Sequence, residues 1–337
     1  MNSSLFAVDE RLARLDKLNE PLLKLNQYVD FDAIAMAVDK ACPRPARSKG
    51  GRPPYPTVLM VRALVIKYLW NMSFDQLEMQ LLDRVRLQRF VGLQESACIP
   101  DAKTFWSFHE KLVQAGVADI IFDEVSRQLL SAGYWARGGQ LIDATLIPVP
   151  VQRNNRDDNK LIKQGDIPED WSENKRRQKD TDASWTRKHN KNHFGYKGSV
   201  NVDKRCKLIR KIHVSTASES DQKHIELVLD PMNTSKTLYG DRGYTMTDGL
   251  AKQGIRDAIQ RRAPKNQELS KCQKRRNHRL AKTRARVEHV FGGLAQMGGK
   301  FVRSIGVVRA AFAIKFQATV YNMKRFTYLA SGGLNPF

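Results

Sequence analysis

The chain has 337 residues, 41% of them hydrophobic, which is enough for a sizeable core in one large domain or in two or three smaller ones. Lysine and arginine number 57 against 35 acidic residues, so the formal net charge is +22. This excess favours a polyanionic partner, above all nucleic acid, and the alternative is a merely basic protein such as a ribosomal one.

Simple features exclude several other classes of protein. The four cysteines are scattered without a CxxC pair, which argues against structural zinc and fits a reducing cytosol. The first residues lack the basic-then-apolar pattern of a signal peptide. The longest apolar stretch, residues 58–70, is too short to span a membrane and contains two basic residues. We therefore expect a cytoplasmic protein with no membrane partner.

In chain order, residues 1–55 come first and predict an N-terminal helical arm that ends in a Pro- and Gly-rich linker. Residues 56–135 then predict an all-helical domain, with a capping box from Ser73 whose helix continues its apolar face to Val85. Short helices with basic residues nearby suggest a helix-turn-helix-like module that contacts DNA through Arg84 and Arg86. The alternative is a plain helical bundle that serves dimerisation.

The periodicity changes in residues 136–331. Apolar and alternating runs predict strands at 141–149, 196–202, 207–214 and 236–240, and helices at 220–229, 277–297 and 308–329. The order strand, strand, strand, helix, strand, helix is that of a ribonuclease-H-like fold. The expected fold class is therefore α/β, with a ribonuclease-H-like catalytic domain after an N-terminal all-helical DNA-binding or dimerisation domain.

Residues 151–192 form a charged insertion between the first two of these strands. Residues 152–192 contain 11 lysines and arginines and eight acidic residues but few large apolar groups, so we expect a mobile loop or an arm that folds on binding. Trp171 and Trp185 stand out in it. They could stack on a displaced base, although such tryptophans more often only anchor a loop.

Three acidic residues are the candidate catalytic groups. Asp143 lies inside an apolar strand, Asp241 follows the last predicted strand, and Glu288 lies beside the apolar stripe of a basic helix. Each acid has another interpretation. Asp143 could be a structural buried acid, Asp241 a turn residue, and Glu288 a solvated acid paired with Arg284. If the strands and helix converge, the three carboxylates could hold two Mg²⁺ ions about 3.5–4 Å apart, with Mn²⁺ as a substitute.

The segment that leads into Glu288 is the most basic part of the chain. Residues 251–286 contain 13 lysines and arginines but two acidic residues, a net charge of +11. We expect this segment to follow a DNA backbone and to make binding strongly salt-dependent. The candidate contacts in it are Arg275, Arg276, Arg284 and Arg286.

Four motifs give the chain a resemblance to a known family. They are Leu141–Thr145, Phe194–Lys197, Gly240–Tyr244 and Arg284–Gly292. Together with the helical residues 52–112 they resemble the DDE transposases of bacterial insertion sequences, most closely the group named after insertion sequence five. The resemblance extends over nearly the whole chain.

The resemblance implies a function and assigns roles. Asp143, Asp241 and Glu288 would be the catalytic triad, Arg284 would orient a phosphate or Glu288, and Lys197 and Arg242 would be further phosphate contacts. The protein would bind the inverted repeats of its element as a homodimer or larger assembly, cut their ends by two-metal hydrolysis, and join the 3′-hydroxyls to target DNA. It would work at the bacterial nucleoid. The alternatives are a non-catalytic, domesticated DNA-binding protein and a nuclease of the same fold.

Overall fold

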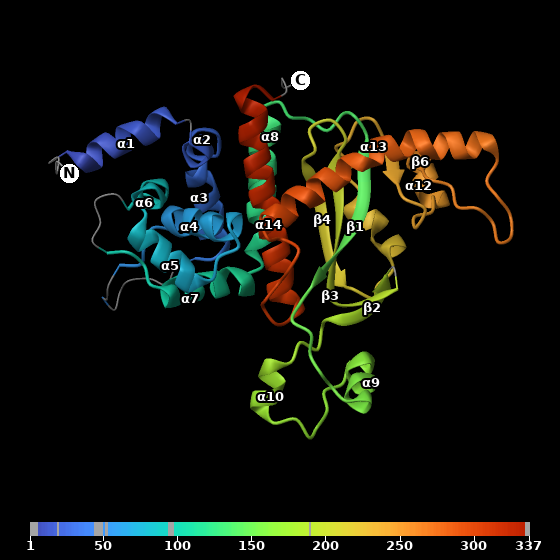
Figure 1. Cartoon of the computed structure of the whole chain (residues 1–337), viewed down its shortest axis with the longest axis horizontal. Helices are drawn as coiled ribbons and strands as arrows, with labels where there is room; N and C mark the ends of the chain where they lie inside the picture. Colours follow the sequence, from blue (N-terminus) through green and yellow to red (C-terminus); the bar gives the residue numbers. More distant parts are fainter. Residues whose placement is uncertain are drawn as a thin grey trace.

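A computed structural model describes residues 6–18, 20–43, 50, 53–93, 98–188 and 190–333. Its architecture is mixed α/β, with a layer of helices on one side and a six-stranded mixed sheet on the other (Figure 1). The helices α8 (Val117–Ser131) and α14 (Val307–Tyr328) lie side by side between the two parts. In the described part of the chain, no helix is both long enough and apolar enough to cross a membrane.

Before the first strand, the described residues contain helices and no strand. Ser73 begins α5 with the predicted capping box, because its hydroxyl accepts from the Gln76 backbone N–H and the Gln76 side chain accepts from the Ser73 N–H. This helix ends before Val85, which begins the next helix and is 40% exposed, so the predicted continuation of the apolar face is wrong. The helices of this layer, besides α8, are α1 (Ala7–Lys17), α2 (Pro21–Tyr28), α3 (Phe31–Ala41), α4 (Thr57–Leu69), α5 (Phe74–Asp83), α6 (Val85–Val91) and α7 (Ala102–Gln114).

The predicted N-terminal arm is packed for much of its length. Leu25 of α2 and Phe31 and Ile34 of α3 are buried in the same apolar core as α4 and α8. Residues 20–41 are thus part of the helical layer rather than a free arm. The predicted linker lies partly outside the described residues, because 44–49 and 51–52 are not described.

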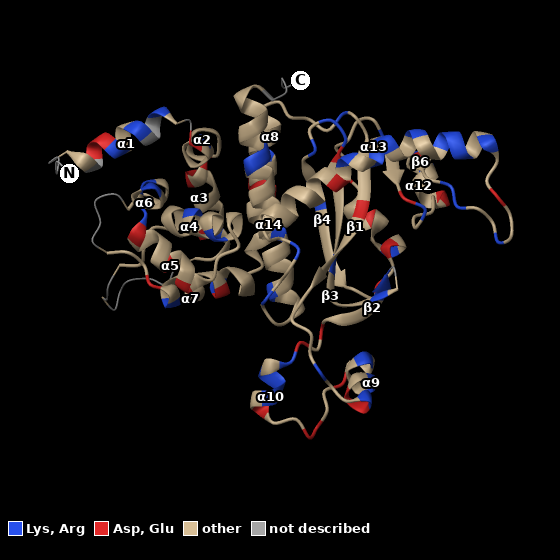
Figure 2. Cartoon of the chain, in the orientation of Figure 1, with Lys and Arg blue, Asp and Glu red and all other residues tan. Residues whose placement is uncertain are grey.

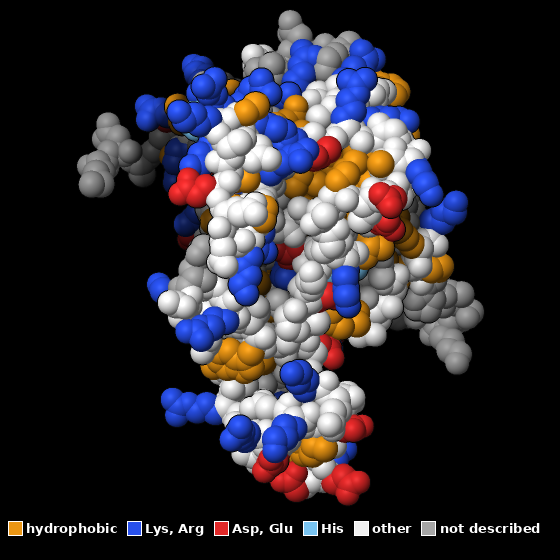
Figure 3. All heavy atoms as spheres, turned by 90° about the vertical axis from the view of Figure 1, so that its right-hand side faces the viewer, with side chains coloured by type: hydrophobic (Ala, Val, Ile, Leu, Met, Phe, Trp, Pro, Cys, Tyr) orange, Lys and Arg blue, Asp and Glu red, His pale blue; other side chains and the backbone are white. Residues whose placement is uncertain are grey.

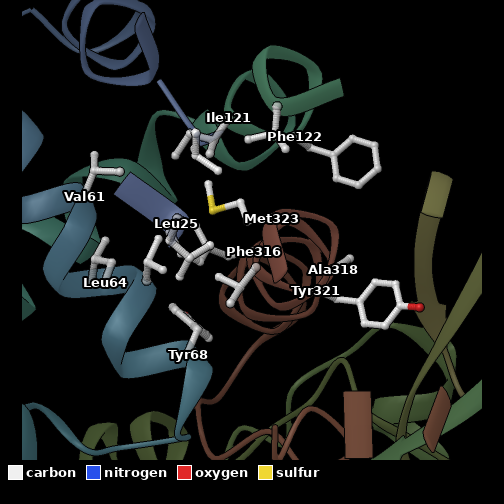
Figure 4. Close-up of a cluster of buried hydrophobic side chains, with 14 of the residues drawn as sticks. Leu25, Val61, Leu64, Tyr68, Ile121, Phe122, Phe316, Ala318, Tyr321 and Met323 are labelled. Atoms are coloured by element: carbon white, nitrogen blue, oxygen red, sulfur yellow. The ribbon is translucent and has the colours of Figure 1, made fainter. Parts of the chain in front are cut away.

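Helix α14 is the centre of this core. Its middle, residues 316–323, is buried on all sides, which explains why this part lacks a polar face. Figure 4 shows Phe316 and Met323 among side chains of the helical layer, and Tyr321 pointing the other way. The Gln317 amide donates to the backbone oxygens of Tyr68 and Met297, each at 2.9 Å. Helix and sheet layers are therefore held by one shared helix.

The sheet has the topology expected from the sequence, with two additions. Strand β1 pairs antiparallel with β3 and parallel with β5, β5 pairs parallel with β6, and β4 pairs with the far side of β3. The strands β2 and β6 were not predicted. The strands are β1 (Gln140–Pro148), β2 (Ser184–Lys188), β3 (Lys191–Asp203), β4 (Ile209–Thr216), β5 (Thr237–Gly240) and β6 (Arg256–Ile259).

Helices cover both faces of this sheet. One face carries α13 (Lys271–Gln296) and α14, and its core is continuous with that of the helical layer. The other face carries the short helices, with Ile142 of β1 buried against Ile225 and Leu250. These are η1 (Asp221–His224), α11 (Ile225–Val228) and α12 (Asp248–Lys252), and a single π turn, η2 (Leu329–Gly333), follows α14.

The charged insertion contains packed secondary structure, which differs from the mobile loop we expected, whereas the alternative of an arm that folds on binding stays a prediction. It forms α9 (Arg156–Gln164) and α10 (Glu173–Gln178), which lie together away from the sheet in Figure 1, and the strand β2. Trp171 is 3% exposed and donates from its indole N–H to Asp158 at 3.1 Å. This small internal contact organises a segment that has few other apolar groups.

Candidate active site

Asp143 and Asp241 lie on neighbouring parallel strands. Gln140 and Leu141 of β1 pair with Leu238 and Tyr239 of β5. Continuing this register by two residues leads along β1 to Asp143 and beyond β5 to Asp241, which directly follows the strand, and Asp241 is near enough to raise the pKa of Asp143. Because residues in register on adjacent strands point to the same face and strands lie about 4.8 Å apart, the sheet itself brings the two carboxylates together.

Asp143 is a buried acid with an unusual pKa. Its side chain is 13% exposed, and burial raises its pKa to about 6, a shift to which nearby Asp241 and Glu288 also contribute. The Ala144 backbone N–H and the Arg284 guanidinium oppose the shift by binding the charged form, at 2.8 and 2.7 Å. At neutral pH Asp143 is therefore ionised in spite of its surroundings.

Asp241 is held by the tight turn that follows β5. Its Oδ1 accepts from the Gly243 backbone N–H at 2.8 Å, so the turn engages one of its two oxygens. A side chain at Gly243 would come within 3.0 Å of that same oxygen, so the turn favours glycine. Tyr244 ends the turn inside the apolar core, where burial and the charges of Asp143 and Asp241 raise the pKa of its hydroxyl.

Helix α13 brings the third acid and a basic residue to the same place. Arg284 Nη1 lies 2.7 Å from Asp143 Oδ2 and 3.8 Å from Glu288 Oε1 one turn along the helix. Glu288 is 58% exposed, whereas the neighbouring Val287 is fully buried against the core. Arg284 thus links the helix to β1 and keeps Glu288 at the edge of the site.

The donor set suits a hard divalent cation. Carboxylate oxygens are the ligands that Mg²⁺ prefers, and three are offered here by one sheet edge and one helix. Among the described residues no three His, Cys, Asp or Glu side chains stand close enough to hold a metal together. The negative charges of the three acids repel one another, and the positive charge of Arg284 offsets those of Asp143 and Glu288. Its buried Nε has no hydrogen-bond partner, so the guanidinium is incompletely satisfied in this position.

Comparison with known protein families identifies the family to which a chain with this site belongs. A family model described as a transposase DDE domain matches residues 134–323, more than half of the chain, and one described as a transposase domain (DUF772) matches residues 9–111. The chain belongs to the DDE transposases. A DDE domain implies a ribonuclease-H-like fold, DNA as partner and, in general, a divalent metal. The search of solved structures gave no match.

Several candidate DNA contacts of the transposase lie on α13, where Figure 2 shows a row of basic residues. Arg275 is exposed, but Arg276 donates to the backbone oxygens of Ile259 and Asp257, at 2.8 and 3.0 Å, and so fixes β6 to the helix. Arg286 donates to the Lys204 carbonyl at 2.8 Å. Figure 3 shows many basic side chains on the side of the molecule that carries β6 and α12.

The remaining candidates differ in how available they are. Arg242 is exposed beside Asp241, whereas the Lys197 ammonium is 2.6 Å from Asp221 and its side chain is 11% exposed. The ammonium of Lys197 is therefore already engaged in an ion pair within the chain. In the helical layer Arg84 is half exposed, and Arg86 lies 3.1 Å from the buried Glu20.

The two tryptophans of the insertion have different surroundings. Trp171 is buried and hydrogen-bonded, so the structure does not support its stacking on a base and shows a loop anchor instead. Trp185 is 46% exposed, with its ring centroid 5.1 Å from that of Phe194. A base could reach its exposed part, and this part of the prediction stays open.

Sequence reasoning missed the residues that fix the loop around Asp241. Gln222 of η1 donates to the Thr245 carbonyl at 2.9 Å and accepts from the Thr245 N–H at 2.7 Å. This reciprocal pair holds the loop on the far face of the sheet, next to the buried Tyr244. Tyr244 stands inside a recognised motif, but nothing in the sequence alone links it to Gln222.

Proposed function

We propose that this transposase cuts phosphodiester bonds at the ends of its own insertion sequence and joins the freed 3′-hydroxyls to target DNA. The observation that supports the proposal is the contact of Arg284 with both Asp143 and Glu288, next to Asp241, which directly follows the strand that pairs with β1. The four motifs resemble the group named after insertion sequence five, to which we assign the chain.

In the proposed mechanism Asp143, Asp241 and Glu288 would together hold two Mg²⁺ ions, which Mn²⁺ could replace. Such ions lower the pKa of an attacking water and offset charge on the leaving oxygen. Asp143 is ionised above about pH 6 and is thus ready to bind a cation at neutral pH. Asp241 offers the oxygen that its turn does not engage, and Glu288 is exposed enough to turn toward the sheet.

Arg284 has two roles in this scheme. Without a cation it offsets the charge of Asp143. Its fork of donors also suits a phosphate, so Arg284 would bind a DNA phosphate near the three acids. Arg242, Arg275 and Arg286 extend this contact along the backbone of the same DNA.

The division of labour follows the two parts of the fold. We assign terminal-repeat binding and pairing of protomers to the helical region, residues 56–135 with the arm 1–55, and the chemistry to residues 136–331. Arg84 is the more accessible of the two candidate arginines in the helical layer. The expected partners are double-stranded DNA and at least one further copy of the chain, at the bacterial nucleoid.

The test is cleavage and joining with DNA from both flanks of the coding region plus a target plasmid, in Mg²⁺, in Mn²⁺ and in chelator. Asp143→Asn, Asp241→Asn and Glu288→Gln should each lower cleavage by at least about a thousandfold, since metal chemistry supplies several kcal/mol. Asp248→Asn is the matched control, because Asp248 is an exposed acid on α12. It should leave cleavage unchanged.

The outcomes separate the alternatives. Cutting without joining would indicate a nuclease of the same fold. Specific binding of the flanks without metal-dependent cutting, in every divalent metal tried, would indicate a domesticated DNA-binding protein. Equal loss in Asp248→Asn would mean that the effect is structural.

A further inference from the structure

A hollow lies away from the three acids, where the helical layer, the insertion and the start of α14 meet. Its volume is about 860 Å³, within the range of small-molecule and nucleotide pockets. None of the three acids lines it. One wall, residues 301–303, is fixed to the sheet by a backbone hydrogen bond from Val302 to Pro148, at 3.2 Å.

This wall connects the hollow to the proposed active site. Pro148 lies five residues beyond Asp143 on β1, which is roughly 16 Å along a strand. That distance equals about five base-pair steps of duplex DNA. One DNA molecule can therefore contact both places.

The lining is strongly basic. It contains five lysine and arginine side chains and two acidic ones, and one acid, Glu110, already accepts from Nη2 and Nε of Arg309, at 2.8 and 3.0 Å. Neither Lys67 nor Arg303 takes part in an ion pair within the described part of the chain. Burial, with a further contribution from nearby Arg303, lowers the pKa of Lys67 to about 8. Two like charges that face one hollow favour an anion between them.

The rim is aromatic as well as basic. Trp106 of α7 is 54% exposed and Phe301 is 40% exposed, and both line the hollow. Exposed aromatic faces beside cationic groups form a stacking platform for unpaired bases, whereas the bases of a duplex already stack on one another. Figure 1 shows α10, which contributes Arg176 and Arg177, just below the start of α14.

We infer that this hollow binds an unpaired nucleotide of single-stranded DNA, with its phosphate between Lys67 and Arg303 and its base on Trp106. This inference rests on the proposed function in that it takes DNA as the substrate. It assigns to the transposase a contact outside the acidic site and outside the basic helix α13.

The test measures binding of a short labelled oligodeoxythymidylate to the full chain by fluorescence anisotropy, over a series of salt concentrations. Trp106→Leu should weaken binding between about fivefold and about a hundredfold, the range for loss of one base stack. Lys67→Met with Arg303→Gln should lower the slope of log affinity against log salt by about 0.7 for each phosphate that is no longer neutralised. An unchanged thermal midpoint identifies the folded variants, and Lys67→Arg, which keeps the charge, should retain binding.

The controls use residues of the same kind outside the hollow. Trp135 is 41% exposed and Lys111 is exposed on α7, so Trp135→Leu and Lys111→Gln should bind the oligonucleotide like the unaltered protein. Equal weakening by the control and test variants would overturn the inference. Full competition by inorganic phosphate at the same concentration would overturn the nucleotide part of it.

Failure of this inference can be distinguished from failure of the proposed function. Cleavage of element ends with no effect of the Trp106 and Lys67 variants on oligonucleotide binding would remove the hollow and keep the transposase mechanism. Oligonucleotide binding that depends on Trp106 while Asp143→Asn leaves cleavage intact would keep the hollow and remove the proposed catalytic triad.

Discussion

The helical layer and the sheet each contain a buried titratable group, and burial acts on the two in opposite ways. His109 is 7% exposed, its Nε2 lies 2.9 Å from the Tyr68 hydroxyl, and burial, reinforced by Lys67 and Arg309, lowers its pKa to about 3. Burial raises the pKa of Asp143 to about 6. At neutral pH His109 is therefore uncharged, whereas Asp143 carries a charge.

The difference indicates what each place is for. A neutral imidazole with a hydrogen-bonded hydroxyl is a stable part of a core. A buried carboxylate that stays ionised lowers the stability of the fold and persists where the charge is useful. The Tyr68 hydroxyl satisfies one nitrogen of the neutral His109, although the buried Nδ1 has no hydrogen-bond partner in the described part of the chain, whereas Asp143 stays charged beside Arg284.

The largest effect is expected at His109. Its pKa is about 3 in the folded chain and 6.5 when unperturbed, so the unfolded state binds more protons between these values. The free energy of unfolding should therefore fall as pH falls, by about 2 kcal/mol at pH 5 and by about 4 kcal/mol near pH 3. His109→Gln should remove this slope, which urea unfolding at several pH values would measure. If His109→Gln unfolded with the same dependence of free energy on pH, His109 would not be the group that causes it.

Asp143 should show the opposite slope. Its pKa is about 6 in the folded chain and 3.8 when unperturbed, so the folded state binds more protons between these values and loses stability as pH rises through them. Asp143→Asn should stabilise the protein in chelator by up to about 3 kcal/mol above pH 7 and by almost nothing near pH 4. Urea unfolding of both proteins at the two pH values gives the difference. Destabilisation at pH 7 would mean that the ion pair with Arg284 outweighs burial.

The smallest effects are expected at two capping boxes, one in each region. Ser73 caps α5 and Ser270 caps α13 in the same way, so replacing either by Ala should cost about 1 kcal/mol. Ser73→Ala should lower global stability, because α5 is packed through Leu77 and Leu81. The first turns of α13 are largely exposed, so Ser270→Ala should speed local hydrogen exchange there with little change in the global transition. Equal global loss at both positions would show that α13 unfolds with the core.

Local patterns predicted much of this fold. The capping box at Ser73 and the apolar run around Asp143 each placed an element within a few residues. These signals depend on neighbours in the chain, which the sequence contains. The element order led us to expect the strands of Asp143 and Asp241 near each other, and β1 does pair with β5, whereas the catalytic role of the two acids stays a prediction.

The errors have physical causes too. Strand β6 is four residues long and lies within a very basic segment. Its backbone is satisfied by the side chain of Arg276, which donates to it, and by pairing with strand β5. The insertion folds around the distant contact between Trp171 and Asp158, which no periodicity reveals. The contact between Arg284 and Asp143 spans 141 residues of sequence separation, so its geometry required the structure.

The position of α14 has a consequence for biosynthesis. This helix follows every other long element in the sequence, yet Phe316, Ala318 and Met323 fill the middle of the core. A nascent chain that lacks it leaves the apolar faces of α4 and α8 uncovered, although N-terminal regions generally fold first during translation. The ribosome therefore has to finish nearly the whole polypeptide before its interior can close, and interrupted products should be targets for chaperones and proteases.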